Sequence, residues 1–389
     1  MMTWKILILL PAFLWLVQLP FLLWNISNWK SLSKNDKDDG GHYLVSILIP
    51  ARNEEKRLEA CIHSLYAQQG VSIEVIVYND QSTDKTGSIL SLLQDLYPNL
   101  IVVEGTSLPE GWYGKPHACW ELAKLAHGDW LLFIDADTRL QPDAVFRFLL
   151  TSKTTGADLI SGFGRLSSPG KASALLTSLM TFVIAMHLPI RLVHSSPDPR
   201  FVAINGAAIF IRKSIYQLTD GHRAVKTELV EDMALGRVVK KSGGKVLLSN
   251  LTDVLTTEMY DNLASAWRGY RKNLFPGLGK SYAIAFLVEI YYTVLFLLPW
   301  VMLIIFGIEL VVNGMHNKLI LVPFTIWLSL WSIIAGWMAK YTVDLRFAMP
   351  KWITVCTPCS AALLMAVLIT SLLRHATKRG YDWKGRVYS

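Results

Sequence analysis

The sequence predicts an α/β domain built on a parallel sheet, with an N-terminal membrane anchor before it and transmembrane helices after it. Three observations support this fold class. Of the 389 residues, 52% are apolar, and the mean hydropathy is positive, which is too apolar for an ordinary soluble domain. Apolar runs long enough to cross a bilayer lie towards both ends of the chain. Between them, short apolar runs alternate with segments of helical periodicity, which is typical of a parallel sheet with crossover helices.

The first element is the apolar run from Trp4 to Trp24, which has about the twenty residues that a transmembrane helix needs. Only Lys5, Gln18 and two prolines interrupt it. A secretory signal would have a shorter apolar core and a small-residue cleavage site, and neither is evident. We therefore expect residues 1–30 to form an uncleaved transmembrane anchor.

A polar linker from Ser31 to Gly41 separates this anchor from a domain that we expect at residues 42–280. Its first part alternates apolar runs typical of buried strands with segments of helical period. The expected strands are Leu44–Ile49, Ile73–Tyr78, Leu100–Val103 and Trp130–Ile134. The expected helices include one with apolar Leu58, Ile62 and Leu65, and a second at Ile89–Leu96.

Polar residues follow three of these strands, at Pro50–Glu54, Asp80–Asp84 and Asp135–Asp137. In open α/β sheets the ligand binds beyond the carboxyl ends of the strands, so one cleft can hold all three groups. Asp80 is suited to accept a hydrogen bond from a nucleobase nitrogen or a ribose hydroxyl. We expect the neighbouring Ser82 and Thr83 to cap the helix that follows them.

Asp135 and Asp137 are the central pair of this cleft. Carboxylate oxygens are hard ligands for Mg²⁺ or Mn²⁺, and the phosphates of a nucleotide diphosphate can complete the coordination shell. The alternative from the residues alone is a solvated turn after a strand.

A second acidic pair, Glu231 and Asp232, stands at the front of an apolar-periodic segment. A helix N-terminus stabilises negative charge, so the pair can simply mark the start of a helix. The functional alternative is that Asp232 acts as a general base on an acceptor.

Three further apolar stretches, at Ala283–Val312, Leu319–Ala339 and Trp352–Leu373, predict a transmembrane block at residues 281–373 and a basic aromatic tail at 374–389. The net charge of +8 comes from scattered lysines and arginines, with clusters beside the membrane segments, and there is no basic recognition helix. A membrane surface explains this charge better than nucleic acid does.

Ala172–Val193 is also long enough to suggest a span. If it crossed the bilayer, about 30 Å thick, Asp137 and Asp232 would lie on opposite sides of the membrane. We therefore expect either an interfacial segment that guides a lipid acceptor or a core helix of the domain. In the first case Met180, Phe182, Met186 and His187 would lie near lipid chains.

The motifs Pro50-Ala51-Arg52-Asn53-Glu54, Asn79-Asp80-Gln81-Ser82-Thr83-Asp84, Asp135-Ala136-Asp137 and Glu231-Asp232 occur in this order along residues 44–275. In this respect the sequence resembles the family 2 glycosyltransferases. The resemblance implies a nucleotide-binding sheet of the glycosyltransferase A type, a nucleotide-sugar donor, and Mg²⁺ or Mn²⁺. It implies substrate contacts for Pro50, Arg52, Glu54 and Asp80, a place for Asp135 near the ribose or sugar, metal binding by Asp137 with Asp135, and catalysis by Asp232 with Glu231.

A narrower resemblance rests on residues 111–119 and 383–388, which look like the membrane-bound branch containing carotenoid-acid glycosyltransferases and ceramide glucosyltransferase-like proteins. It implies that Lys115 contacts the diphosphate. Arg268 and Arg271 resemble an arginine-rich motif that closes on the leaving diphosphate. Lys272 stands where the family usually has tryptophan, so a basic amphipathic helix at the membrane surface is the alternative.

Together these features predict an inverting, metal-dependent transfer of a hexose from a nucleotide sugar, which we expect to be UDP-glucose. The acceptor would be an apolar membrane molecule such as a carotenoid acid or a lipid alcohol. We expect a multi-pass protein of the cell membrane with its catalytic domain in the cytoplasm, and no nucleic-acid partner. The alternatives are a processive polysaccharide synthase and a non-catalytic membrane protein that binds nucleotide sugar or lipid.

Overall fold

The computed structural model describes residues 2–34, 43–167, 170–313, 321–377, 381–383 and 386–388. The chain divides into two compact units, which we call the helical unit and the sheet unit. The helical unit comprises Met1–Asn28, Ser168–His187 and Tyr260–Arg379, and the sheet unit comprises Trp29–Ser167, Leu188–Met259 and Gly380–Ser389.

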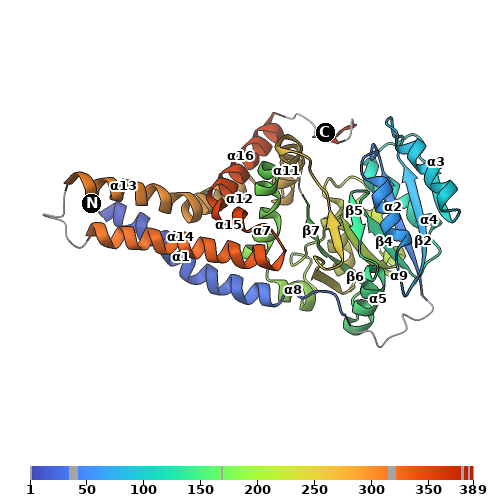
Figure 1. Ribbon diagram of the computed structural model, residues 1–389, viewed down its shortest axis with the longest axis horizontal. Helices are drawn as coiled ribbons and strands as arrows, with labels where there is room; N and C mark the ends of the chain where they lie inside the picture. Colours follow the sequence, from blue (N-terminus) through green and yellow to red (C-terminus); the bar gives the residue numbers. More distant parts are fainter. Residues whose placement is uncertain are drawn as a thin grey trace. The chain divides into compact units, whose positions relative to one another are not determined.

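The core of the sheet unit is a seven-stranded sheet with strand order β3-β2-β1-β4-β8-β6-β9 (Figure 1). Its strands are β1 (Leu44–Ala51), β2 (Ser72–Asn79), β3 (Leu100–Glu104), β4 (Trp130–Ile134), β6 (Leu159–Phe163), β8 (Ala208–Arg212) and β9 (Val246–Asn250). Strands β3, β2, β1 and β4 are parallel, as predicted. Strand β8 runs antiparallel to both β4 and β6, a reversal that the sequence pattern did not indicate.

Helices connect the parallel strands because each chain must return to the same edge of the sheet. These connecting helices are α2 (Leu58–Tyr66), α3 (Thr86–Leu96), α4 (Gly114–Leu125) and α5 (Ala144–Thr155). The later helices of the sheet unit are α8 (Ile190–Ser195), α9 (Lys213–Leu218), the 3₁₀ helix η1 (Gly221–Val225) and α10 (Glu231–Lys241). In α2 the buried side chains include Leu58, Ile62 and Leu65, which confirms the predicted period. Helix α5 ends at Thr155 and is followed by Gly156, whose φ of 67° lies in the left-handed region.

Aromatic side chains fill the sheet core. Phe210 of β8 stacks on Trp130 of β4 with ring centroids 4.7 Å apart and on Phe148 of α5 at 5.3 Å. Burying a side chain of this size stabilises a fold by roughly 1.5–3 kcal/mol. This packing holds β4, and therefore the residues directly after it, in a fixed position.

A smaller sheet adjoins the end of β4. It has the order β5-β10-β7, with β5 (Thr138–Leu140) antiparallel to β10 (Leu255–Thr257), and β10 parallel to β7 (Arg165–Leu166). The N–H of Glu258 donates a hydrogen bond to the carbonyl oxygen of Asp137 at 3.0 Å. The small sheet therefore fixes the turn that carries Asp137.

The helical unit contains the predicted membrane segments. Its helices are α1 (Met2–Ser27), α6 (Lys171–Thr177), α7 (Leu179–His187), α11 (Leu263–Gly277), α12 (Tyr282–Tyr292), the π-helical turn η2 (Thr293–Leu297), α13 (Leu298–Asn313), α14 (Leu321–Arg346), α15 (Lys351–Val355) and α16 (Thr357–Ala376). Within it, α1, α13 and α14 lie side by side (Figure 1). In the described part of the chain, three stretches are long and apolar enough to cross a membrane: Leu9–Ser27, Tyr282–Val312 and Thr357–Ala376. The predicted stretch Leu319–Ala339, which α14 covers from Leu321 onwards, is not among them.

The segment 172–193 is not one continuous helix, because it is divided among α6, α7 and α8. Phe182 and Met186 of α7 are 0% and 1% exposed, so these two side chains belong to a protein core rather than to a lipid-contacting surface. Phe182 packs edge-on against Phe296 at 5.9 Å. Of the two alternatives for this segment, the one that places Phe182 and Met186 near lipid chains is therefore contradicted, since the interior of the helical unit already encloses them.

The C-terminal tail contributes a short hairpin, β11 (Tyr381–Trp383) with β12 (Arg386–Tyr388), to the sheet unit. The other predictions for this tail, and those for the linker beyond Lys34, fall on residues outside the described ranges.

Candidate active site

The ends of β1, β2 and β4 bring the predicted polar residues to one edge of the sheet. Strands β2 and β4 both pair with β1, and the N–H of Asp80 donates to the carbonyl oxygen of Ala51 at 2.7 Å. Asp80 is only 3% exposed, so it is a buried carboxylate rather than part of a simple surface turn.

Two loops after these strands are joined by hydrogen bonds. A guanidinium nitrogen of Arg52 donates to the carbonyl oxygens of Asp80 at 2.5 Å and Gln81 at 3.4 Å. Asn53, whose φ is 52°, accepts a hydrogen bond from the N–H of Thr83 at 2.8 Å. These bonds give Arg52 a structural task, which is to fix the loop that carries Asp80.

Glu54, another predicted residue of the first loop, also helps to fix the conformation of this loop. The N–H of Glu54 donates to Thr86 Oγ1 at 2.8 Å, and the carbonyl oxygen of Glu54 accepts from the N–H groups of Arg57 and Leu58 at the start of α2. Pro50 is the penultimate residue of β1. Substrate contacts by Pro50, Arg52 and Glu54 stay predictions.

The prediction that Ser82 and Thr83 cap α3 is wrong. Helix α3 begins at Thr86, and Ser82 Oγ instead accepts from the N–H of Asn53 at 3.0 Å. The local turn is closed by Asp84, whose Oδ1 accepts from the N–H of Thr86 at 2.9 Å. A tertiary bond to the neighbouring loop has replaced the local capping bond.

Lys115 lies in the first turn of α4 and joins the two acidic pairs. Its Nζ is 2.7 Å from Asp135 Oδ1 and 3.2 Å from Glu231 Oε1. Burial alone would lower the pKa of Lys115, but attraction to Asp135 and Glu231 outweighs it and holds the pKa well above its ordinary value. Lys115 is therefore a permanent positive charge, and Asp135 does not lie in a merely solvated turn.

Asp232 is held by two backbone N–H groups. Its Oδ1 accepts from Met233 at 2.7 Å and its Oδ2 accepts from Gly206 at 2.8 Å. Burial, followed by repulsion from Glu231, raises the pKa of Asp232 to about 6, although Lys115 and both N–H groups oppose this shift. A carboxylate with such a pKa is ionised at neutral pH and basic enough to accept a proton. Helix α10 begins at Glu231, so the helix-start and functional interpretations are compatible.

Gly206 is a site residue that the sequence reasoning missed. A Cβ added to it would lie 2.8 Å from Lys115 Nζ, 3.4 Å from Asp232 Oδ2 and 3.9 Å from Asp135 Oδ2. Glycine therefore leaves room where these three side chains converge, and any larger residue must displace the Lys115 ammonium. The available signal was the Asn205-Gly206 pair just before the apolar run of β8.

His222 was missed as well. It is 1% exposed, and its Nδ1 lies 2.9 Å from the hydroxyl of Tyr216. Burial lowers the pKa of His222 to about 3; the charge of Glu231 raises this pKa and the charge of Lys115 lowers it further. His222 is therefore a neutral histidine that senses both charges of the Lys115–Glu231 pair.

His117 lies inside α4. It is 5% exposed and packs edge-on against Trp112 with ring centroids 5.5 Å apart. Its surroundings are those of a core residue.

The donor set near Asp137 fits a divalent metal only in part. Asp135 and Asp137 offer hard carboxylate oxygens, but the described residues contain no group of three or more His, Cys, Asp or Glu side chains arranged to hold a metal. Phosphate and water oxygens would have to complete the shell, as is usual for Mg²⁺. The nearby Cys61 is a neutral thiol, because burial and then the charges of Asp137 and Glu54 raise its pKa.

Arg268 and Arg271 lie on α11, which belongs to the helical unit. There, the carbonyl oxygen of Arg271 accepts a hydrogen bond from the Ser371 hydroxyl at 2.6 Å. A role for either guanidinium at the diphosphate stays a prediction.

Comparisons with known proteins agree with the motif resemblance. The chain is 29% identical over 244 residues to 4,4'-diaponeurosporenoate glycosyltransferase of Staphylococcus aureus (strain USA300). That match covers 61% of this chain and only 62% of the relative. Among solved structures, mannosyltransferase PcManGT from Pyrobaculum calidifontis in complex with GDP-Man and Mn²⁺ has a TM-score of 0.57 and 15% identity, over 96% of this chain and 99% of that chain.

The structural likeness shows the fold, which is the predicted glycosyltransferase A type with a mixed sheet. Residues 46–219 match the family described as Glycosyl transferase family 2. The motif resemblance is therefore confirmed over residues 46–219, which match a family 2 glycosyltransferase domain.

Proposed function

We propose that this protein is a membrane-anchored, inverting glycosyltransferase that moves a hexose from a nucleotide sugar to an apolar membrane acceptor. The observation that carries the proposal is the environment of Asp232. Two backbone N–H groups orient its carboxylate, burial raises its pKa to about 6, and Gly206 keeps the space beside it open towards Lys115 and Asp135. This is a base positioned next to a site for an anionic leaving group.

On the donor side, Asp80 binds the nucleoside and Lys115 binds the diphosphate as a point charge. Asp135 and Asp137 would hold Mg²⁺ or Mn²⁺, which when bound neutralises charge on the phosphates. Glu231 contacts Lys115 at 3.2 Å and so positions this cation between the two halves of the site.

On the acceptor side, Asp232 removes the proton of a hydroxyl. The acceptor oxygen then attacks the anomeric carbon from the face opposite the diphosphate, so the new bond forms as the bond to the diphosphate breaks and the configuration inverts. Arg268 and Arg271 are proposed to bind the departing diphosphate.

The chemical class of the acceptor determines how much Asp232 contributes to the rate of transfer. A carotenoid acid is already ionised near neutral pH, so Asp232 would orient it rather than deprotonate it. A lipid alcohol requires a true base. Asp232→Asn should therefore reduce transfer to an alcohol far more than transfer to a carboxylate, and an equal loss on both acceptors would contradict this distinction.

Three observations support a membrane acceptor: the stretches able to span a bilayer, the apolar acceptor in the name of the carotenoid-acid relative, and the basic residues beside the membrane segments. The expected donor is UDP-glucose, and we place the catalytic domain in the cytoplasm, where nucleotide sugars are made.

The decisive experiment incubates membranes containing the protein with radiolabelled UDP-glucose and either Mg²⁺ or Mn²⁺, extracts the lipids and identifies the labelled product. We expect one glycosylated lipid with wild-type protein, and none after Asp137→Ala or after chelation of the metal. A long polymer product would instead indicate a processive polysaccharide synthase. Full labelling with Asp137→Ala would refute the proposed donor site.

A further inference from the structure

A cavity of about 700 Å³ opens in the sheet unit, on a different part of the small sheet from the Asp137 turn. Asp137 precedes β5 and lies next to Glu258 after β10, whereas the cavity is lined by Gln141 after β5 and Thr256 within β10. A strand advances about 3.3 Å per residue, so Thr256, which pairs with Arg139, lies roughly 7 Å from Asp137 along the strands, and Gln141 lies roughly 13 Å from it. None of the residues assigned to the donor site lines this cavity, so we treat it as a second site.

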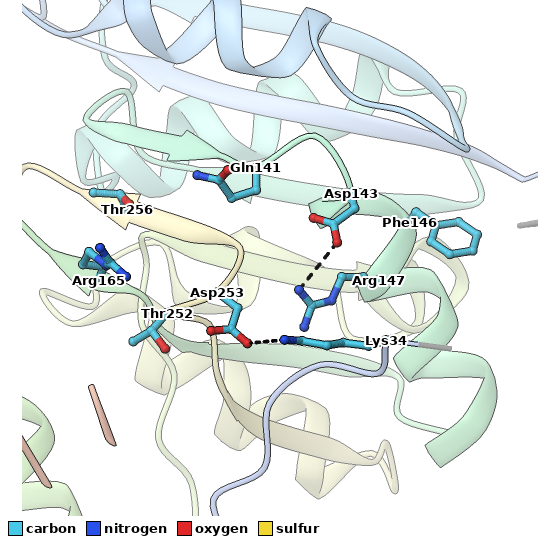
Figure 2. A pocket seen from close by; sticks show the side chains of 9 residues that line it. All are labelled: Lys34, Gln141, Asp143, Phe146, Arg147, Arg165, Thr252, Asp253 and Thr256. Atoms are coloured by element: carbon cyan, nitrogen blue, oxygen red, sulfur yellow. Dashed lines mark ion pairs between the residues drawn. The ribbon is translucent and has the colours of Figure 1, made fainter. Parts of the chain in front are cut away.

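The walls of this cavity carry more positive than negative charge. Three cations, Lys34, Arg147 and Arg165, come from three separate segments, and they face two acids, Asp143 and Asp253 (Figure 2). A cavity of this size would hold a small organic ligand rather than a single inorganic ion. Because the walls carry a net positive charge, we expect the ligand to be negatively charged.

Of the three cations, Arg147 has a structural task, whereas Lys34 is held only by an exposed ion pair. Arg147 is buried, donates hydrogen bonds to the carbonyl oxygens of Leu32 and Ser33 at 3.0 and 3.1 Å, and lies 3.6 Å from Asp143. Lys34 contacts Asp253 at 2.9 Å, but both side chains are largely exposed, at 67% and 46%. An exposed pair of this kind contributes only about 0–1 kcal/mol, so Lys34 can turn to a ligand at little cost.

Arg165 is the remaining cation. It is exposed on β7, and no ion pair joins it to an acid within the described ranges of the chain. Thr256 stands opposite it in the β10–β7 register, so the guanidinium and a hydroxyl line the same side of the cavity (Figure 2). Guanidinium matches the oxygens of a phosphate group in a bidentate manner, and the hydroxyl adds a donor.

We propose that this cavity binds a phosphate-bearing ligand through Arg165 and Lys34, apart from the nucleotide-sugar site. The phosphate belongs either to the headgroup of an anionic lipid or to a soluble phosphate ester. Asp253 competes with the ligand for Lys34, so it limits the affinity.

The test uses full-length protein in detergent and records the rise in thermal unfolding temperature on addition of each probe, because a ligand that binds the folded state stabilises it. The probes are glycerol 1-phosphate, short-chain phosphatidylglycerol and, as the uncharged match without phosphate, short-chain diacylglycerol. We expect stabilisation by phosphatidylglycerol or glycerol 1-phosphate but not by diacylglycerol. A response to the lipid alone assigns a headgroup, and a response to both assigns the phosphate itself.

Single substitutions test whether the stabilisation by the probes arises from binding in the cavity. Arg165→Gln should weaken binding at least about tenfold, as expected for a lost charge-assisted hydrogen bond. Asp253→Asn should strengthen binding, and Lys115→Gln should leave it unchanged because Lys115 belongs to the donor site. Arg191→Gln, an exposed arginine on α8 outside the cavity, is the matched control. The proposal is overturned if neither anionic probe stabilises the protein, if Arg191→Gln loses as much binding as Arg165→Gln, or if only Lys115→Gln loses it.

Discussion

Replacing Gly206 by alanine should disable the candidate active site while leaving the fold intact. The new Cβ would lie 2.8 Å from Lys115 Nζ, whereas ordinary contacts begin near 3.4 Å, so the ammonium must move by about 0.6 Å. The atom that moves is the far end of a flexible side chain, and the backbone need not follow. The contact from Lys115 Nζ to Asp135 Oδ1, now 2.7 Å, would lengthen or break. Displacements of about 1 Å at a reacting centre cost about a hundredfold in rate, so we expect kcat to fall by roughly 10- to 100-fold.

The assay is the initial rate of sugar transfer to extracted lipid, measured beside the thermal unfolding curve of the same preparation. Gly162→Ala is the matched control, because a Cβ there would lie 1.9 Å from the carbonyl oxygen of Ser249 and must displace backbone. Gly162→Ala should lower the unfolding temperature strongly, and Gly206→Ala should hardly change it. Wild-type turnover in Gly206→Ala, or equal destabilisation of both variants, would refute the assignment of Gly206 to the site.

Three other predictions concern charge and loop shape. Transfer to an alcohol acceptor should decline as the pH falls from 7 to 5, because Asp232, with a pKa of about 6, becomes protonated and can no longer accept a proton. A pH–rate profile tests this prediction. Asp232→Asn should abolish the proton transfer. Lys115→Gln should raise KM for the donor. It should also move the pH–rate profile to higher pH, because in the wild-type protein the charge of Lys115 lowers the pKa of Asp232. An unchanged profile would contradict the coupling between Lys115 and Asp232. Asn53→Ala should lower the free energy of unfolding by about 1–3 kcal/mol, because it removes the hydrogen bond from Thr83 and places alanine at a φ of 52°. Denaturant unfolding measures this loss.

The sequence predicted the parts of the fold that depend on local periodicity and on the alternation of strands with helices. Asp80, Asp135 and Asp137 could be grouped because the carboxyl ends of parallel strands meet at one edge. The capping prediction for Ser82 and Thr83 failed because a bond from Asn53, 29 residues away from Ser82, competes with the local one. No local pattern contains such a tertiary partner.

Gly206 shows a different limit of sequence reasoning. Candidate site residues are chosen by the chemistry of their side chains, and glycine has none. Its importance comes from the atoms around it, Lys115 Nζ and Asp232 Oδ2, which come from distant parts of the chain. Likewise, His222 could be assigned only once burial and its contact with Tyr216 were known.

Glu231 connects the donor and acceptor halves of the candidate site. Its carboxylate lies 3.2 Å from Lys115 Nζ, and its charge also raises the pKa of Asp232. Removing that charge in Glu231→Gln would therefore have two effects of different kind: Lys115 would lose one of its two acidic contacts, and Asp232 would become a weaker base. The first effect acts on donor binding and the second on proton transfer. If Glu231 served only to start helix α10, its substitution would change neither donor binding nor proton transfer. A rise in KM for the donor together with a pH–rate profile displaced to lower pH therefore distinguishes a functional role of Glu231 from a purely structural one.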